Sequence, residues 1–376
     1  MRIIRPFKTT PNFEYFRQVI KRETTAGPVP LFEGTVDPEI MSEATGIPFQ
    51  FERYFELLNI SDQSSPEMIM LGVKFLELHL AFYKLVGYDF ITAFPTTPLA
   101  RTPWQLKANP AQEGKTRLWQ NEHKGVITSR EEFREFPWPK PDQWTIASVY
   151  VLQNRLPPGA KFIQFINGIF EEMRALMGFE AFAIKSMEEP ELVNDILEKS
   201  TELVSSLMEK ASAHPDVGAI YYCDDMSFNN GPMASPGWFR EYVFPRQKKL
   251  VDIAHQHRKP VLFHSCGRSE LLMKDLIETI GIDAYHSFQD NVIPVEEYYK
   301  RYHDQIAILG GVDVDLLARG APEQVRKRTR EILEVCGIGG GFAIGSGNSL
   351  TNFCKLENYY AMLDETRKWN EEHGWK

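Results

Sequence analysis

The chain has little of what marks secreted, membrane-spanning or nucleic-acid-binding proteins. Its 376 residues include four cysteines, too few for a disulfide framework, which favours a reducing compartment. No run approaches about 18 uncharged apolar residues, so no membrane-spanning helix is expected. The first residues are basic but lack the apolar stretch of a signal peptide. A net charge of −9 disfavours a nucleic-acid surface, which needs clustered Lys and Arg. We therefore expect a cytoplasmic protein that binds neither nucleic acid nor a membrane. An enzyme that acts on a small molecule is compatible with this composition.

Short apolar runs that end in polar or glycine residues recur along the chain, and most of them precede a helical pattern. Helix starts are marked by Ser65-Pro66 and Ser235-Pro236, where an N-cap serine precedes a proline. Alternating strands and helices predict βαβ units and a parallel sheet, so we expect an α/β protein with the (β/α)8 TIM-barrel fold and an N-terminal helical extension. The expected strands are Val29–Phe32, Asp89–Phe94, Lys161–Ile166, Ala219–Tyr222, Val261–Phe263, Asp283–Ser287, Ile306–Leu309 and Gly341–Ile344.

One segment, residues 97–142, breaks this rhythm because it is rich in proline, tryptophan and charge. Arg117–Trp119 and Gly125–Ile127 suggest a small β-hairpin inserted after the second strand. We interpret the segment as an insertion over the barrel mouth and not as a second domain, so residues 1–376 are expected to form one barrel domain. A surface flap without a role is the alternative.

The motif His264-Ser265-Cys266-Gly267 follows the apolar run Pro260–Phe263. Residues i and i+2 of a strand point to the same face, about 6–7 Å apart along the backbone. An imidazole and a thiol at this spacing can share a metal ion such as zinc. A buried thiol beside a hydrogen-bonded histidine is the other reading of the same motif.

Other polar residues follow the expected strands, and the active site of a barrel lies at those carboxyl ends. Of the adjacent carboxylates Asp224 and Asp225, only one can point into the site, and we favour Asp224 as a general base or ligand-orienting group. A carboxylate such as Glu33 in a low-dielectric mouth could have a raised pKa or pair with a metal. Helix caps, surface positions and plain turns are the structural alternatives. The candidate catalytic residues are Asp224, Glu33, Gln289 and Asp313, and the candidate substrate-binding residues are Asn167 and Asn348.

An ordered set of motifs resembles the uroporphyrinogen decarboxylase superfamily, above all its methylcobalamin:coenzyme M methyltransferase-like branch. The resemblance runs from about Val29 to the C-terminus. Its motifs are Tyr222–Asp225, Gly231–Pro236, His264–Gly267, Gly310–Asp313, Gly320–Val325 and Glu357-Asn358.

The resemblance implies a (β/α)8 barrel with zinc held by a His-x-Cys pair and a later cysteine. His264 and Cys266 match the pair, but Asn348 stands where the later cysteine is expected, and Cys354 lies six residues further on. The third ligand could be a carboxylate, such as Glu33 or Asp224, or the thiol of Cys223; alternatively there is no metal.

The function implied by the resemblance is that of a corrinoid-dependent methyltransferase. It would move a methyl group between a small methylated or methoxylated compound and a cobalamin or corrinoid protein. Since Asn348 replaces a thiolate, an oxygen ligand suits the zinc better than a soft thiol, and we expect that coenzyme M is not used. A homodimer is one option for the assembly.

Two other functions stay open. A tetrapyrrole decarboxylase of the same superfamily needs no metal, but its arginine-rich N-terminal motif is missing and Ala93–Thr96 lacks its aspartate. A non-catalytic corrinoid or tetrapyrrole binder would have no use for the metal pair, so His264 and Cys266 together disfavour it.

Overall fold

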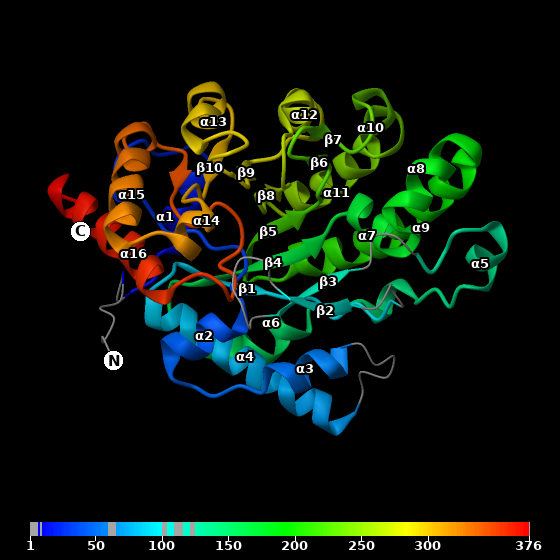
Figure 1. The fold of residues 1–376 in the computed structure, drawn as a ribbon, viewed down its shortest axis with the longest axis horizontal. Coiled ribbons are helices and arrows are strands. Elements are labelled where there is room, and N and C mark those ends of the chain that lie inside the picture. Colours follow the sequence, from blue (N-terminus) through cyan, green and yellow to red (C-terminus); the bar gives the residue numbers. More distant parts are fainter. Residues whose placement is uncertain are drawn as a thin grey trace.

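A seven-stranded parallel sheet forms the centre of the computed structural model, which describes residues 7, 10–58, 65–99, 104–108, 116–120 and 125–375. The strand order is β1–β4–β5–β8–β9–β10–β11, and the sheet is curled into a half-barrel (Figure 1). All six neighbouring pairs are parallel. The strands are β1 (Phe90–Ala93), β4 (Lys161–Asn167), β5 (Val217–Cys223), β8 (Val261–His264), β9 (Ala284–His286), β10 (Ala307–Leu309) and β11 (Phe342–Ala343).

Helices surround the sheet on its outer side (Figure 1). Both expected helix starts are confirmed, since Ser65 accepts a hydrogen bond from the Met68 amide and Ser235 from the Trp238 amide. The described helices are α1 (Phe13–Ile20), α2 (Pro38–Thr45), α3 (Phe51–Leu58), α4 (Pro66–Val86), α5 (Arg130–Glu135), α6 (Ala147–Leu152), α7 (Ile169–Met177), α8 (Phe179–Glu188), α9 (Pro190–Ala213), α10 (Pro236–Tyr242), α11 (Phe244–Gln256), α12 (Glu270–Lys274), α13 (Val295–Tyr302), α14 (Val314–Arg319), α15 (Pro322–Cys336) and α16 (Leu356–Glu372), with the shorter η1 (Pro141–Gln143), η2 (Gln153–Arg155) and η3 (Asp275–Ile280).

The first expected strand, Val29–Phe32, is reduced to one parallel bridge between Leu31 and Ile344. The Phe32 amide donates to the Ile344 carbonyl at 2.8 Å, and the Ile344 amide donates to the Pro30 carbonyl at 3.0 Å. Proline has no amide hydrogen for a ladder, so Pro28 and Pro30 explain why this segment runs beside β11 without extending into a strand. Seven strands and a bridge therefore stand where eight strands were expected.

The expected hairpin exists, but with a different partner strand. β2 (Trp104–Ala108) pairs antiparallel with β3 (Thr116–Gln120), which contains the predicted Arg117–Trp119. Gly125–Ile127 is not part of this hairpin, because the amides of Val126 and Ile127 donate to the Leu176 carbonyl of α7 at 2.7 and 3.0 Å. A second, shorter hairpin, β6 (Ser227–Phe228) with β7 (Gly231–Pro232), follows β5.

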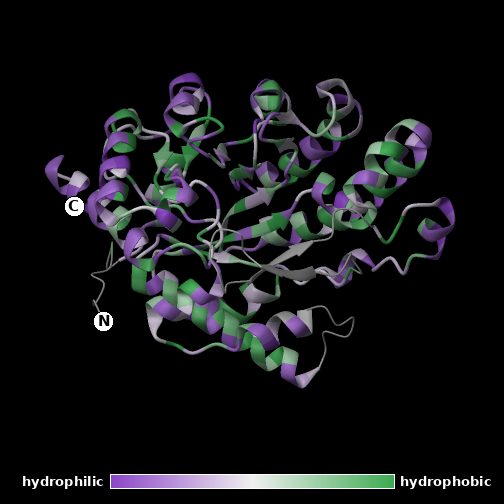
Figure 2. Cartoon of the chain, viewed as in Figure 1, coloured by the Kyte–Doolittle hydropathy of each residue, from purple (hydrophilic) through white to green (hydrophobic). Residues whose placement is uncertain are grey.

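The core lies between the sheet and the inner faces of the helices. All four residues of β1 and all four of β8 are buried. Figure 2 shows the same division, with hydrophobic residues on the central strands and hydrophilic ones on the outer turns of the helices. None of the helices in the described part of the chain combines the length and the apolar character needed to cross a membrane.

Candidate metal centre

Three potential metal ligands meet where β5 and β8 end. His264 is the last residue of β8 and Cys266 lies two residues further on, so their side chains share a face and the Cys266 Sγ lies 3.4 Å from the His264 Nε2. Asp225 follows β5, accepts a hydrogen bond from the Cys266 amide at 2.8 Å, and places Oδ1 3.7 Å from the His264 Nε2. The ligand atoms of all three residues lie within 4.8 Å of one another.

Burial favours the uncharged forms of His264 and Cys266. His264 is 9% exposed, and burial lowers the pKa of its imidazole, with Asp225 acting in the opposite direction. Burial raises the pKa of the Cys266 thiol well above its usual value, and the charge of Asp225 adds to this. The neutral imidazole is already the form that binds a metal, whereas the thiol must lose its proton, which a bound cation favours.

The chemistry of these donors fits zinc. Imidazole nitrogen, thiolate sulfur and carboxylate oxygen are the three ligand types that zinc takes in proteins. Three protein ligands leave a fourth tetrahedral position free for a substrate, as in catalytic zinc sites. Asn348 is also brought here, since its Nδ2 donates to the Cys266 Sγ at 3.2 Å.

Asp224 points away from this cluster, contrary to the prediction that it is the carboxylate facing the site. It is fully buried and accepts hydrogen bonds from the amides of Phe170 and Glu171 at 3.3 and 2.8 Å, in the first turn of α7. Gln247 donates to it as well, at 2.8 Å. Burial raises the pKa of Asp224 to about 6. Amides at a helix N-terminus attract a carboxylate, which explains why the neighbouring Asp225 lies beside the histidine instead.

Glu33 lies on the other side of the sheet opening, next to the segment after β11. It is 1% exposed and accepts hydrogen bonds from the amide and the hydroxyl of Ser346, both at 2.7 Å. Burial raises its pKa to about 8, although the two hydrogen bonds act in the opposite direction. The expectation of a raised pKa for this carboxylate is therefore met.

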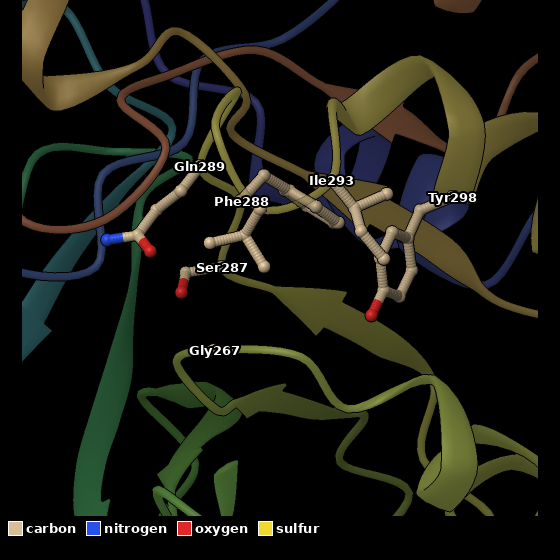
Figure 3. Close-up of a pocket in the computed structure, with 7 residues that line it drawn as sticks. Gly267, Ser287, Phe288, Gln289, Ile293 and Tyr298 are labelled. Atoms are coloured by element: carbon tan, nitrogen blue, oxygen red, sulfur yellow. The ribbon is translucent and has the colours of Figure 1, made fainter. Parts of the chain in front are cut away.

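The other predicted residues have partners of their own. Asp313 accepts hydrogen bonds from the amides of Asp315 and Asp290, both at 2.7 Å, and so caps α14. Asn167 donates to Glu172 at 3.1 Å. Gln289 lines a small pocket, shown in Figure 3, with Gly267, Ser287, Phe288, Val292, Ile293 and Tyr298. Within the described residues, no hydrogen bond joins Asp313, Asn167 or Gln289 to the three ligands.

Two residues of the site were missed from the sequence, Tyr221 and His286. The His286 Nδ1 lies 2.8 Å from the His264 Nδ1. The Tyr221 hydroxyl lies 2.9 Å from the His264 Nδ1 and 3.0 Å from the His286 Nδ1. His286 ends β9 in register with His264 at the end of β8. His286 falls within the expected strand Asp283–Ser287, but the sequence of one strand does not show that this residue lies beside His264.

The comparisons with known proteins agree with this fold. The family model for uroporphyrinogen decarboxylase (URO-D) matches residues 119–369. A methylated-thiol--coenzyme M methyltransferase from Methanosarcina mazei is 27% identical over 220 residues, which is 58% of this chain and 56% of that protein. The chain thus matches little more than half the length of this relative. The solved structure of a methyltransferase from the same organism aligns over 94% of this chain and 97% of its own, with a TM-score of 0.63 at 15% identity, which is a likeness of fold. Because the family model covers most of the sequence, the chain belongs to the uroporphyrinogen decarboxylase family.

Proposed function

We propose that the protein is a zinc-assisted, corrinoid-dependent methyltransferase. The observation that carries this proposal is the cluster of Asp225, His264 and Cys266, whose ligand atoms lie within 4.8 Å of one another. The relative named a methylated-thiol--coenzyme M methyltransferase supports the reaction type. The proposed partners are a small methylated or methoxylated compound and a cobalamin or corrinoid protein.

The residues that would hold zinc are His264 through Nε2, Cys266 through Sγ and Asp225 through a carboxylate oxygen. When bound, the ion would act as a Lewis acid on a thiol sulfur of the substrate or on its hydroxyl or ether oxygen. Asp225 also holds the Cys266 backbone through the amide hydrogen bond at 2.8 Å, so the same carboxylate orients the thiol that it would accompany.

The donor set favours an oxygen-bound methyl group. One thiolate with an imidazole and a carboxylate is a harder set than two thiolates with an imidazole, and harder sets favour oxygen ligands. Asn348 adds to this preference, because its Nδ2 donates a hydrogen bond to the Cys266 Sγ at 3.2 Å and withdraws electron density from the sulfur. We therefore propose a methoxylated compound as the methyl donor and not a methylated thiol.

We also propose that residues 1–376 form one closed (β/α)8 barrel domain in the cytoplasm, with residues 97–142 as an insertion at its mouth. The parallel contact of Leu31 with Ile344 supports closure on one side, and the 5.8 Å distance between the rings of Phe32 and Phe90 supports it on the other. Pairing into a homodimer remains an expectation.

The reaction is tested with metal-replete protein, cob(I)alamin and a panel of methoxylated compounds beside methylated thiols. Formation of methylcobalamin, followed by its absorption spectrum, is the expected result, with the methoxylated donors ahead. No methylcobalamin from any donor would refute the proposed reaction, and a clear preference for methylated thiols would refute the proposed donor.

The metal is tested separately by elemental analysis. About one zinc per chain is expected, and Cys266→Ser should remove it. Cys354→Ser is a matched control, because Cys354 is buried beside Thr351, with their side chains 3.5 Å apart, and has no place in the cluster. Zinc that survives Cys266→Ser, or is lost in Cys354→Ser, contradicts the assignment.

The second candidate is a tetrapyrrole decarboxylase, which the name of the matched family favours. This activity would need neither zinc nor a corrinoid. Decarboxylation of uroporphyrinogen by protein treated with a chelator, without methyl transfer under any condition, would select it over the methyltransferase. Stoichiometric binding of a corrinoid or tetrapyrrole with no turnover of any kind would select the non-catalytic binder.

A further inference from the structure

We propose that His286 and Tyr221 are positioning residues that hold His264 in one tautomer, so that the His264 Nε2 presents its lone pair to the metal site. This inference rests on the zinc role proposed above. His286 and Tyr221 are buried and would not contact the ion, but they would determine whether His264 can bind it.

The positions of the imidazole protons follow from a neighbouring group that can only accept a hydrogen bond. The His286 Nε2 lies 3.3 Å from the Ser346 carbonyl oxygen, which has no proton to give, so this nitrogen is the donor. In a neutral imidazole the other nitrogen is then an acceptor. The His286 Nδ1 therefore has a lone pair that faces the His264 Nδ1 at 2.8 Å.

One proton must lie between these two Nδ1 atoms, because two lone pairs or two N–H groups would repel each other at that distance. Since His286 supplies the lone pair, His264 carries the hydrogen on Nδ1. The His264 Nε2 is then unprotonated, and it is this atom that lies 3.4 Å from the Cys266 Sγ and 3.7 Å from the Asp225 Oδ1.

Tyr221 completes a triangle with the two rings. Its hydroxyl lies 2.9 Å from the His264 Nδ1 and 3.0 Å from the His286 Nδ1. A hydroxyl both donates and accepts, so it can accept from His264 while donating to His286. The hydroxyl is therefore compatible with the tautomer that the direct contact between the rings sets, and it shares the single His264 Nδ1 proton with His286.

The backbone passes close to two of these rings, those of His286 and Tyr221. A Cβ on Gly310 would lie 2.9 Å from the His286 Nε2 and 2.4 Å from the Ser346 carbonyl oxygen. The space between the backbone and the ring therefore has no room for a side chain. A Cβ on Gly34 would lie 2.4 Å from the Tyr221 ring. Glycine at these two positions is thus needed for the triangle to be packed as it is.

The triangle is anchored at its far end by Glu33. The Ser346 amide and hydroxyl both donate to this carboxyl group at 2.7 Å, which holds the carbonyl that His286 uses. A continuous series of contacts therefore runs from Glu33 through Ser346 and His286 to His264.

Partners of this kind matter for metal affinity. A histidine ligand whose second nitrogen loses its hydrogen-bond acceptor typically binds metal about 10–100-fold more weakly. Replacing His286 with a side chain that cannot accept from the His264 Nδ1 should cost a factor in that range.

Two substitutions of His286 separate the role of each nitrogen. In His286→Asn, the amide oxygen can take the place of Nδ1 and keep the acceptor for His264. In His286→Gln, the amide reaches the place of Nε2 and keeps the contact with Ser346 but not the acceptor. Tyr221→Phe preserves the ring and removes only the hydroxyl. His303→Gln is a matched control, because His303 contacts the Tyr299 carbonyl on α13, away from the metal residues.

The experiment measures zinc affinity by competition with a chromophoric chelator and records the visible spectrum of the cobalt-substituted full chain. His286→Gln should bind zinc about 10–100-fold more weakly with an altered cobalt spectrum, whereas His286→Asn and His303→Gln stay close to the unmodified protein. Tyr221→Phe should also weaken binding. Circular dichroism of the metal-free variants shows whether each one folds.

The outcomes are distinct. Unchanged affinity in a folded His286→Gln overturns the inference, and so does an equal loss in the folded Gln and Asn variants, because the acceptor would then not matter. If His286→Gln does not fold, unchanged affinity in Tyr221→Phe overturns it. Failure of the unmodified chain to bind zinc or cobalt refutes the proposed metal site itself, and the inference falls with it. Zinc binding that is independent of His286 refutes only the positioning role.

Discussion

Glu33 makes a quantitative prediction about stability. Its carboxyl group is 1% exposed, and burial raises its pKa from 4.5 to about 8. Between these two values the folded chain holds a proton that the unfolded chain releases, so stability falls as the pH rises through this window. At about 1.4 kcal/mol for each tenfold change in proton affinity, the loss reaches at most about 5 kcal/mol above pH 8.

Glu33→Gln should remove this loss. The Ser346 hydroxyl donates to Glu33 when this group is ionised, whereas a protonated Glu33 donates to the hydroxyl, which then donates to the Asn348 carbonyl 2.8 Å away. Gln can accept from the Ser346 amide through its oxygen and donate to the Ser346 hydroxyl through its nitrogen. The amide thus reproduces the hydrogen bonds of the protonated acid. We expect the variant to equal the unmodified protein at pH 5 and to exceed its free energy of unfolding by up to about 4 kcal/mol at pH 8.5.

The assay is urea unfolding at pH 5, 7 and 8.5 in the presence of a chelator, with Glu43→Gln as a matched control at an exposed glutamate. The difference between variant and unmodified protein isolates this one group from the others that titrate. A difference that does not change with pH would show that Glu33 ionises normally, and the reasoning from burial would be wrong.

The remaining predictions concern the adjacent carboxylates, the amide beside the thiol and one glycine. Asp225→Asn should weaken zinc binding by at least about tenfold without lowering the melting temperature. Asp224→Ala should lower the free energy of unfolding by about 2–4 kcal/mol without weakening zinc binding. Equal effects of the two substitutions on zinc affinity and on stability would contradict the assignment. Asn348→Cys should tighten zinc binding in chelator competition, because it adds a thiol beside Cys266; unaltered affinity would count against the cluster. Gly168→Ala should destabilise the protein by about 1–3 kcal/mol in thermal unfolding, because its Cβ would lie 2.0 Å from the Asp224 Cγ, and an unchanged melting temperature would contradict that packing.

The fold was predictable because hydrophobic runs and helix caps are local signals. Seven of the eight expected strands are present, and both Ser-Pro helix starts are confirmed. The failures are those where a distant partner decides. Val29–Phe32 is an apolar run, but its prolines limit pairing to a single bridge, and Gly125–Ile127 follows α7 instead of completing the hairpin.

The site shows the same division between local and distant information. The proximity of His264 and Cys266 followed from the two-residue period of a strand, which needs no knowledge of the rest of the fold. The choice between Asp224 and Asp225 depended on where the N-terminus of α7 lies, and its amides take Asp224. His286 required the register between β8 and β9, which places it directly beside His264 and which no single strand reveals.

The side chains around the candidate metal centre divide into two groups with different demands. Asp225 and Cys266 are partly exposed at the opening, where an ion and a substrate could reach them. Tyr221, His286 and Glu33 are almost fully buried, and their polar atoms contact one another or Ser346. A buried polar group lowers the stability of the fold unless it has a hydrogen-bond partner. Loss of one hydrogen bond in this series therefore leaves another buried group without a partner. A substitution in the buried group that removes the acceptor for the His264 Nδ1 should therefore alter metal affinity and stability together, whereas one at the opening should alter affinity alone.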